Sequence, residues 1–290
     1  MIDITELFCK VDDFLKEFIP EYEKRLLADG NIKPSVSSVN LSEIVSIMVN
    51  FHFERYRDFK TYYTRHVRNV LKWAFPKLVS YNRFVELEKT AIIPLLCFLN
   101  SVLGKETGIY IIDSTDLAVC HILREKRHRV FKGVATKGKT STGWFFGFKL
   151  HLICNDKGEL VRFCITKGNV DDRNPVPVLS EGLKGLLIGD RGYIKQVLFE
   201  ELIEKGLKLI TKIKSNMKNK LMPIYEKLLL RKRAVIETIN DQLKNISQIE
   251  HTRHRSPINF LVNLFSGLVA YQLSPKKPSI KFNSTKFIAI

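Results

Sequence analysis

Apolar residues recur at helical spacing over roughly the first hundred residues. The helix predicted over residues 3–17 has an apolar face made of Leu7, Phe8, Val11, Phe14 and Leu15. Three more helices are predicted over residues 41–51, 55–68 and 81–103. Ser42 is the expected N-cap of the first of these three. We therefore expect an all-helical N-terminal domain that ends at about residue 104, where Gly104 and Gly108 interrupt the pattern.

After Gly108 the pattern changes to short apolar runs separated by turn signals. Five strands are predicted, over residues 109–112, 143–154, 160–166, 186–190 and 207–214. The turn Asn-Asp-Lys-Gly at 155–158 pairs the second and third strands antiparallel, and intervening helices make the later strands parallel. A long helix over residues 223–247 follows. This order predicts an α/β domain over residues 105–272, a mixed five-stranded sheet with flanking helices on both faces.

Four aromatic residues open the second predicted strand, and we expect them in the core: Trp144, Phe145, Phe146 and Phe148. No run of 18 apolar residues occurs, so we expect no membrane-spanning helix and no membrane partner. Residues 273–290 are predicted to form a basic C-terminal tail.

The positive charge is concentrated in the second part of the chain. The formal net charge is +17, yet residues 1–100 hold 14 Lys or Arg against 13 Asp or Glu. Residues 101–290 hold 33 against 17. A basic surface of this size favours a polyanion, most simply nucleic acid. No RNA-recognition motif is present, which argues against a basic RNA-binding protein.

Two segments concentrate this charge. Residues 55–68 alternate basic and aromatic side chains, a pattern compatible with a helix-turn-helix DNA-binding domain and equally with a helical domain whose basic face is solvated. Residues 124–139 hold seven bases and one acid in a glycine-containing loop that we expect to be mobile and to contact phosphates. The candidate DNA contacts in and near this loop are Arg127, Arg129, Lys132, Lys137, Lys139 and His151.

Three carboxylates are candidates for a common site. Asp113 and Asp190 each follow an apolar strand, and the two strands are neighbours in the predicted sheet. Glu237 shares a stripe of the last predicted helix with Arg233 and Lys244. An ordinary surface ion pair between Arg233 and Glu237 is the alternative. Converging carboxylates need a counter-charge, which two Mg²⁺ ions would supply, and such ions catalyse phosphodiester cleavage.

These motifs resemble those of DDE transposases of bacterial insertion sequences, which share an RNase H-like fold with retroviral integrases. The resemblance rests on Asp113 in Ile-Ile-Asp-Ser-Thr, Asp190 in Gly-Asp-Arg-Gly-Tyr and Glu237 in Arg-x3-Glu-x6-Lys. One branch of these transposases has the signature Tyr-x2-Arg-x3-Glu-x6-Lys. Arg233, Glu237 and Lys244 match it, whereas Leu230 stands at the Tyr position.

The resemblance implies a transposase with an RNase H-like catalytic domain. Asp113, Asp190 and Glu237 would bind two Mg²⁺ or Mn²⁺ ions, and Arg233 and Lys244 would contact DNA near the element's end. The expected partners are double-stranded DNA, as terminal inverted repeats and target, and a second copy of the chain on that DNA. A cytoplasmic, nucleoid-associated bacterial protein is expected. The alternatives are a metal-dependent DNA nuclease without strand transfer and a catalytically inactive DNA-binding protein.

Overall fold

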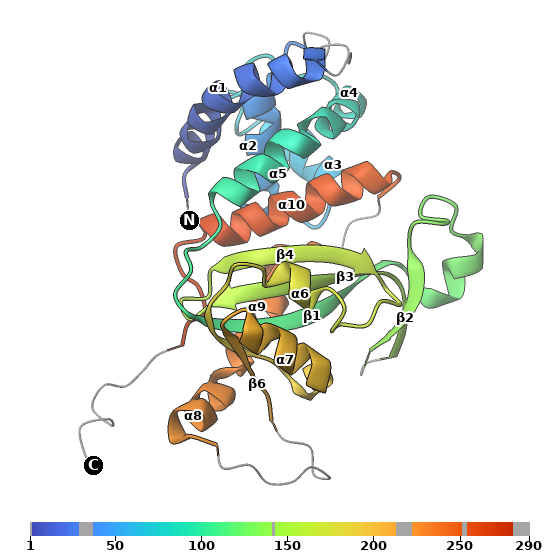
Figure 1. Ribbon diagram of the computed structural model, residues 1–290. Coiled ribbons are helices and arrows are strands. Elements are labelled where there is room, and N and C mark those ends of the chain that lie inside the picture. The colour runs from blue at the N-terminus through green and yellow to red at the C-terminus, as the bar shows by residue number, and fades with distance from the viewer. Residues whose placement is uncertain (1, 29–36, 141–142, 213–221, 251–253, 281–290) are drawn as a thin grey trace. The chain divides into compact units, whose positions relative to one another are not determined.

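The computed structural model describes residues 2–28, 37–140, 143–212, 222–250 and 254–280 (Figure 1). The chain divides into two compact units, each assembled from segments that are distant in sequence. The first unit consists of Met1–Val102, His128–Lys132 and Gln242–Pro275, and the second of Leu103–Arg127, Gly133–Asp241 and Lys276–Ile290. The end of the fifth predicted strand beyond residue 212 and the tail beyond residue 280 lie outside the described residues.

The first unit is helical, as the sequence predicted. Its α-helices are α1 (Ile4–Ala28), α2 (Leu41–Phe53), α3 (Phe59–Thr61), α4 (Tyr81–Leu87), α5 (Ile92–Ser101) and α10 (Pro257–Leu273). Short π-helical or 3-10 segments extend them: η1 (Tyr62–Val67), η2 (Glu88–Ala91) and η5 (Gln242–Ile246). In α1, Leu7, Val11 and Leu15 are fully buried, which confirms the predicted apolar face.

The N-terminus of α2 is capped by Asn40 rather than by Ser42. The Asn40 side chain accepts a hydrogen bond of 2.7 Å from the backbone N–H of Glu43. The Glu43 carboxylate in turn accepts one of 2.8 Å from the Asn40 N–H. This reciprocal pair satisfies two donors that the helix itself leaves open. The Ser42 hydroxyl lies in the first turn of α2 and donates to Asp12 of α1, which joins the two helices.

The basic and aromatic segment 55–68 builds the core of this unit with its aromatic residues. Tyr62 and Tyr63 are both fully buried. The Tyr62 hydroxyl accepts a hydrogen bond from Asn50 at 3.0 Å, and the Tyr63 hydroxyl donates to the Val79 carbonyl at 2.8 Å. These two aromatic rings therefore stabilise the unit, and Arg55, Arg57, Lys60, Arg65 and Arg68 are exposed.

Helix α10 has no counterpart among the predicted elements. It begins at Pro257, directly after Ser256, and is apolar almost all round, which is typical of a helix surrounded by others. It packs against α2 and α5, from the opposite end of the sequence. No helix in the described part of the chain is long and apolar enough to cross a membrane.

The second unit contains a mixed sheet. Its strands are β1 (Ile109–Cys120), β2 (Thr136–Thr140), β3 (Gly143–Asn155), β4 (Leu160–Lys167), β5 (Gly185–Ile188) and β6 (Leu207–Ile210). The order is β2-β3-β1-β5-β6, with β4 also paired to β3. Strands β1, β3 and β4 pair antiparallel, and β5 and β6 pair parallel, which confirms the predicted mixed α/β sheet.

Two features of the sheet differ from the prediction. Strand β2 is a sixth strand, formed by the part of segment 124–139 that was expected to be a mobile loop. Strand β1 does not end at residue 112 but continues to Cys120, because β3 is long enough to pair with all of it. Asp113 and Asp116 therefore lie within β1, and only the parallel pairing with β5 stops at Ile111.

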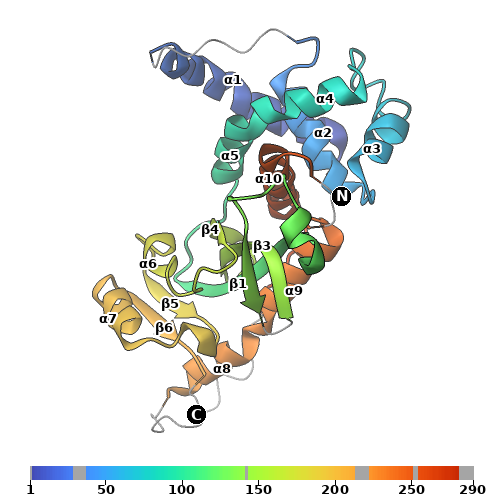
Figure 2. The ribbon, with the colours of Figure 1, turned by 90° about the vertical axis from the view of Figure 1, so that its right-hand side faces the viewer.

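Helices cover both faces of the sheet, as Figure 2 shows for α6 and α7 on one side and α9 on the other. These helices and their neighbours are α6 (Val176–Leu179), α7 (Gln196–Glu204), α8 (Ile224–Lys232) and α9 (Ala234–Asp241), with 3-10 turns η3 (Ile122–Arg127) and η4 (Arg191–Tyr193). Tyr110 and Ile112 of β1 pack into the core under α6 and α7. Ile111 and Asp113 alternate with them and face the side of α9. The helix predicted over 223–247 is interrupted at Arg233.

Candidate active site

Asp113 is a partly buried carboxylate among other charged side chains. On β1 it lies opposite Leu152 of β3. The pKa of Asp113 is raised to about 6, mainly by burial, and the negative charges of Asp190 and Glu237 contribute to this rise. The N–H of Ser114 and the positive charge of Arg233 act in the opposite direction. The four charged groups are therefore close enough to influence one another.

Asp190 is brought beside Asp113 by the register of two parallel strands. Ile111 of β1 pairs with Ile188, the last residue of β5. Asp113 and Asp190 each lie two residues after this pair, Asp113 within β1 and Asp190 just beyond the end of β5. The Asp190 carboxylate accepts a hydrogen bond of 2.6 Å from the N–H of Gly192 and so caps η4. This bond fixes the carboxylate at the carboxyl end of β5.

Helix α9 contributes Glu237 and Asn240 to the same place. Arg233, at the break between α8 and α9, donates a hydrogen bond to Glu237 Oε1. Asn240 lies three residues after Glu237, on the same side of the helix. Its Nδ2 donates to Asp113 Oδ2 at 3.1 Å, which ties α9 to β1. Asn240 was not predicted, although its spacing from Glu237 is a signal that the sequence contains.

The oxygen atoms at this site are of the chemical types that bind a hard divalent cation. Mg²⁺ and Mn²⁺ prefer carboxylate and amide oxygens. Asp113, Asp190 and Glu237 supply carboxylates, and the buried Asn240 Oδ1 has no hydrogen-bond partner. Within the described ranges, no group of three or more His, Cys, Asp or Glu side chains is arranged to hold a metal ion. The Glu237 carboxylate is paired with Arg233 instead.

The sequence matches the family described as "Transposase DDE domain" over residues 103–257, more than half of the 290 residues. The chain belongs to this family. The matched range of this transposase domain includes Asp113, Asp190 and Glu237. No curated protein matches the chain. Among solved structures, a piggyBac transposase in a synaptic complex with hairpin DNA is similar at 13% identity and a TM-score of 0.38. That similarity covers 68% of this chain and 45% of the piggyBac chain, so the present chain spans under half of that protein.

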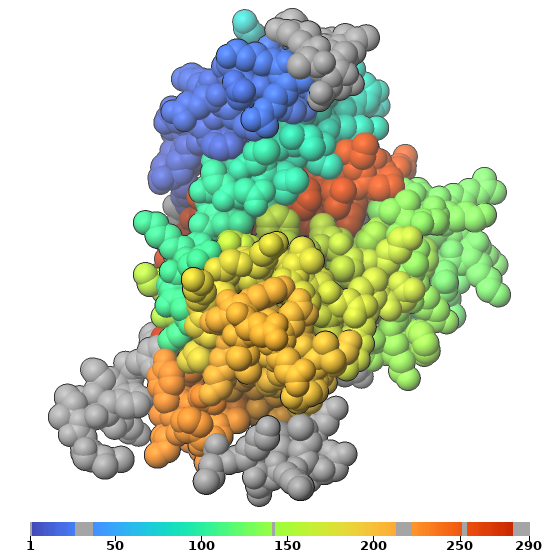
Figure 3. All heavy atoms as spheres, viewed as in Figure 1, coloured from blue at the N-terminus to red at the C-terminus, as the bar shows by residue number. Residues whose placement is uncertain are grey.

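Most basic residues predicted to contact DNA are exposed in this structure. These are Arg127, Arg129, Lys132, Lys137 and Lys139. The segment that contains η3 and β2, light green in Figure 3, lies at the surface. Lys244 lies in η5 of the first unit, where its Nζ is 3.1 Å from Glu250 Oε2. Leu230, at the Tyr position of the family signature, is buried. His251 and Arg253, which follow η5, lie outside the described residues.

His151 is not available to DNA in this structure. Its side chain is 1% exposed, and its Nε2 lies 2.8 Å from Thr166 Oγ1 on the neighbouring strand. Burial lowers the pKa of His151 to about 4, so the ring is neutral at physiological pH. A neutral, enclosed imidazole offers a phosphate neither charge nor access, and we omit His151 from the proposed contacts.

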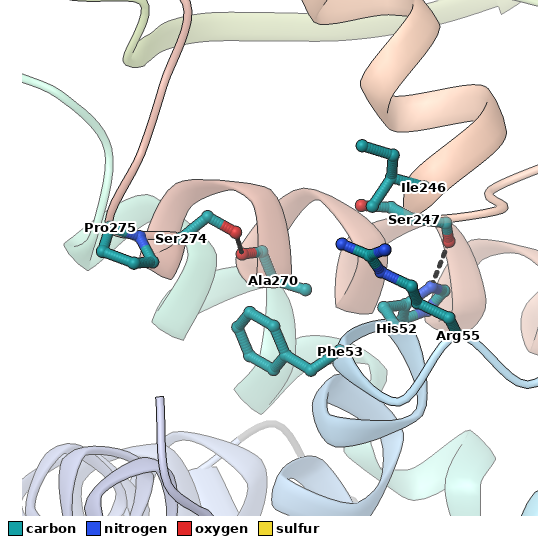
Figure 4. A pocket seen from close by; sticks show the side chains of 8 residues that line it. All are labelled: His52, Phe53, Arg55, Ile246, Ser247, Ala270, Ser274 and Pro275. Atoms are coloured by element: carbon teal, nitrogen blue, oxygen red, sulfur yellow. Dashed lines mark hydrogen bonds between the residues drawn. The ribbon is translucent and has the colours of Figure 1, made fainter. Parts of the chain in front are cut away.

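A cavity of about 190 Å³ lies in the helical unit (Figure 4). His52, Arg55, Ser247 and Ser274 are among its lining residues, and none of the three carboxylates lines it. The His52 ring contacts the Ser247 carbonyl, and burial lowers the pKa of His52 to about 4. The lining residues include none of the acids that phosphoryl chemistry needs, so the candidate active site is the group of three carboxylates in the second unit.

Proposed function

We propose that this chain is the transposase of a bacterial insertion sequence, which cuts DNA at the ends of its element and joins those ends to target DNA. The observation that supports the proposal is the grouping of Asp113, Asp190 and Glu237, whose charges act on one another within the family's domain. A carboxylate such as Asp113, whose pKa is raised by burial and by neighbouring negative charges, is typical of catalytic sites.

The proposed reaction has two steps of the same kind. Water attacks the phosphorus of a phosphodiester at each end of the element, and the bond from phosphorus to the 3′-oxygen breaks. The element then ends in a 3′-hydroxyl, and the flanking strand keeps the 5′-phosphate. That hydroxyl then attacks a phosphodiester of the target, so one bond forms as another breaks. Asp113, Asp190 and Glu237 would hold two Mg²⁺ or Mn²⁺ ions, which supply activation of the attacking oxygen and stabilisation of the leaving one.

Polar and basic residues of both units would hold and orient the DNA. Asn240 fixes the Asp113 carboxylate through its hydrogen bond at 3.1 Å. Arg233 forms an ion pair with Glu237 in the absence of DNA. Its planar guanidinium is suited to bind a phosphate through two parallel hydrogen bonds. Lys244, Arg127, Arg129, Lys132, Lys137 and Lys139 would bind the backbone without reading sequence. Because two ends must be joined, we propose a homodimer on DNA.

Cleavage and strand transfer by single-residue variants test this proposal. Asp113→Asn and Glu237→Gln keep the shape of each side chain but remove the charge, and each should lower cleavage of end-bearing DNA with Mg²⁺ by at least about a hundredfold. Asp116→Asn is the matched control, because Asp116 lies on β1 but faces the other side of the sheet from Asp113. Full cleavage by Asp113→Asn would refute the assignment.

The products separate the alternatives. Joining of cut ends to a target plasmid supports a transposase, whereas cutting without joining identifies a nuclease. DNA binding without any Mg²⁺-dependent cleavage by the unmodified protein identifies an inactive DNA-binding protein. The DNA for this assay comes from the sequence that flanks the reading frame, where the proposal requires short inverted repeats.

A further inference from the structure

Two lysines of β2 lie over the ring of an exposed tryptophan on β3. The distance from Nζ to the centre of the Trp144 ring is 4.8 Å for Lys137 and 5.5 Å for Lys139. Lys139 lies directly opposite Trp144 in the strand pairing, and Lys137 is two residues further along β2. All three side chains therefore share one face of the sheet. Trp144 is 56% exposed, so its predicted place in the core is wrong.

The backbone beneath these side chains is closely held. Gly138 separates the two lysines, and a Cβ there would lie 2.2 Å from the carbonyl oxygen of Gly168. Thr136 Oγ1 donates to Asn169 Oδ1 at 2.9 Å and accepts from the Asn169 N–H at 3.2 Å. Strand β2 is thus anchored on both of its sides, by β3 and by the loop after β4. The two ammonium groups are presented from a fixed backbone and not from a mobile loop.

The group also faces the same side of the sheet as the catalytic acid. Trp144 and Leu152 lie on the same face of β3, since they are separated by an even number of residues. Leu152 is paired with Asp113. Eight residues of strand correspond to about 26 Å, which is the length of about eight base pairs of duplex. One DNA duplex can therefore extend from the acids to the lysines.

We propose that Lys137, Lys139 and Trp144 form a clamp for the phosphate backbone of DNA, with Trp144 as the positioning residue. This clamp rests on the proposed function, since it serves DNA that is bound for cutting. Two ammonium groups held close together repel each other, and the negative face of the indole offsets this repulsion. Their side chains are thereby ordered before DNA arrives, which lowers the entropic cost of binding a phosphate.

Binding to a labelled DNA duplex of arbitrary sequence, without divalent metal, tests the clamp over a range of salt concentrations. Lys137→Gln and Lys139→Gln should each reduce the slope of log affinity against log salt by about 0.9. Trp144→Leu should weaken binding by about threefold to tenfold with little change of slope, because it disorders the charges without removing them. Trp144→Phe keeps an aromatic face and should restore most of the affinity.

Lys205→Gln is the matched control, because it removes one charge from a lysine of the same unit that is paired with Glu201 at 2.8 Å. It should leave both affinity and slope unchanged. If all four clamp variants bind DNA as tightly as the wild type, the clamp proposal is wrong. The two lysines would then serve to prevent pairing of the edge strand β2 with other chains. If Trp144→Leu and Trp144→Phe lose the same amount of affinity for the duplex, the aromatic face of Trp144 has no role in the clamp. If the wild type binds single-stranded DNA more tightly than duplex and Trp144→Leu loses this preference, Trp144 stacks on bases and does not order the lysines.

The same measurements keep this inference separate from the proposed function. If the wild-type protein binds no duplex, the proposed function itself fails. If it binds duplex and cuts end-bearing DNA while the lysine variants behave as wild type, only the clamp fails. Should Trp144→Leu not fold, the two lysine slopes still decide whether β2 touches the DNA backbone.

Discussion

Replacing Glu88 by Gln should stabilise the protein at neutral pH and flatten the pH dependence of its stability. Glu88 lies on η2 and is only 5% exposed. Its Oε1 accepts a hydrogen bond from Asn259 Nδ2 of α10. Burial raises the pKa of Glu88 to about 8, and the positive charge of Lys89 opposes this only in part. Gln has the same shape and keeps the acceptor for Asn259, but it has no proton to lose.

The expected size of the effect follows from the two pKa values of Glu88. The folded protein keeps the proton up to a pH of about 8, whereas the unfolded chain releases it near the ordinary pKa of 4.5. Between these values the unfolded state binds fewer protons, so the free energy of unfolding falls as the pH rises. At about 1.4 kcal/mol per pH unit, Glu88 should make the wild type ~2.5 kcal/mol less stable at pH 7 than at pH 5.

Urea unfolding of wild type and Glu88→Gln at about pH 5 and pH 7 measures this difference. The control is Glu86→Gln, which makes the same change at an exposed residue of α4 that pairs with Arg83 at 2.9 Å. Burial lowers the pKa of both His52 and His254 to about 4, so they change stability in the opposite direction. Their contribution is the same in wild type and variant and cancels in the comparison.

One result of these unfolding measurements would contradict the prediction for Glu88. If the free energies of unfolding of wild type and Glu88→Gln change in parallel between the two pH values, Glu88 is not a protonated buried acid. Tyr81 provides an internal check, since the charge of Glu88 contributes to the raised pKa of that phenol. In Glu88→Gln the pKa of Tyr81, followed by its ultraviolet absorbance, should move down towards its ordinary value.

Three further substitutions test other parts of the structure. Asn240→Ala should lower the rate of DNA cleavage by about tenfold or more while thermal unfolding stays near wild type, because it frees the Asp113 carboxylate without disturbing the core; a rate equal to wild type would refute a positioning role. Gly147→Ala should leave little folded protein by circular dichroism, because the new Cβ would lie 2.0 Å from the Leu117 carbonyl oxygen; normal folding would contradict the strand register. Asn40→Ala should cost about 1 kcal/mol in urea unfolding through loss of the α2 cap, and an unchanged midpoint would count against that cap.

The parts of the fold that could be predicted are those whose burial is indicated by a local pattern of apolar residues. The apolar face of α1 and the apolar runs of β3 and β5 identify themselves, because only a core requires them. Strand β2, with the sequence Thr-Lys-Gly-Lys-Thr, has no such signal. It is a strand because β3 offers a free edge and because Gly138 permits close approach to Gly168, and both conditions come from distant residues.

In the candidate site, too, some features have a local sequence pattern and others depend on distant residues. The order and spacing of Asp113, Asp190 and Glu237 were enough to name the three acids. Their proximity depends on the register of β1 against β5, which no local pattern specifies. Asn240 escaped prediction because an amide on a helix surface is common, and only the contact with Asp113 distinguishes it. Trp144 was misplaced because an aromatic run does not reveal where the neighbouring strand stops.

The interleaved course of the chain determines the order in which the protein can be completed during synthesis. The helical unit requires α10, whose residues 257–273 are among the last to be made, before α2 and α5 can bury their apolar faces. The first hundred residues therefore keep apolar surface exposed during synthesis until the whole mixed sheet has been translated. A copy of the gene that is cut short before α10 should not yield a free helical fragment able to occupy DNA and compete with the intact protein, but an unstable product open to proteolysis.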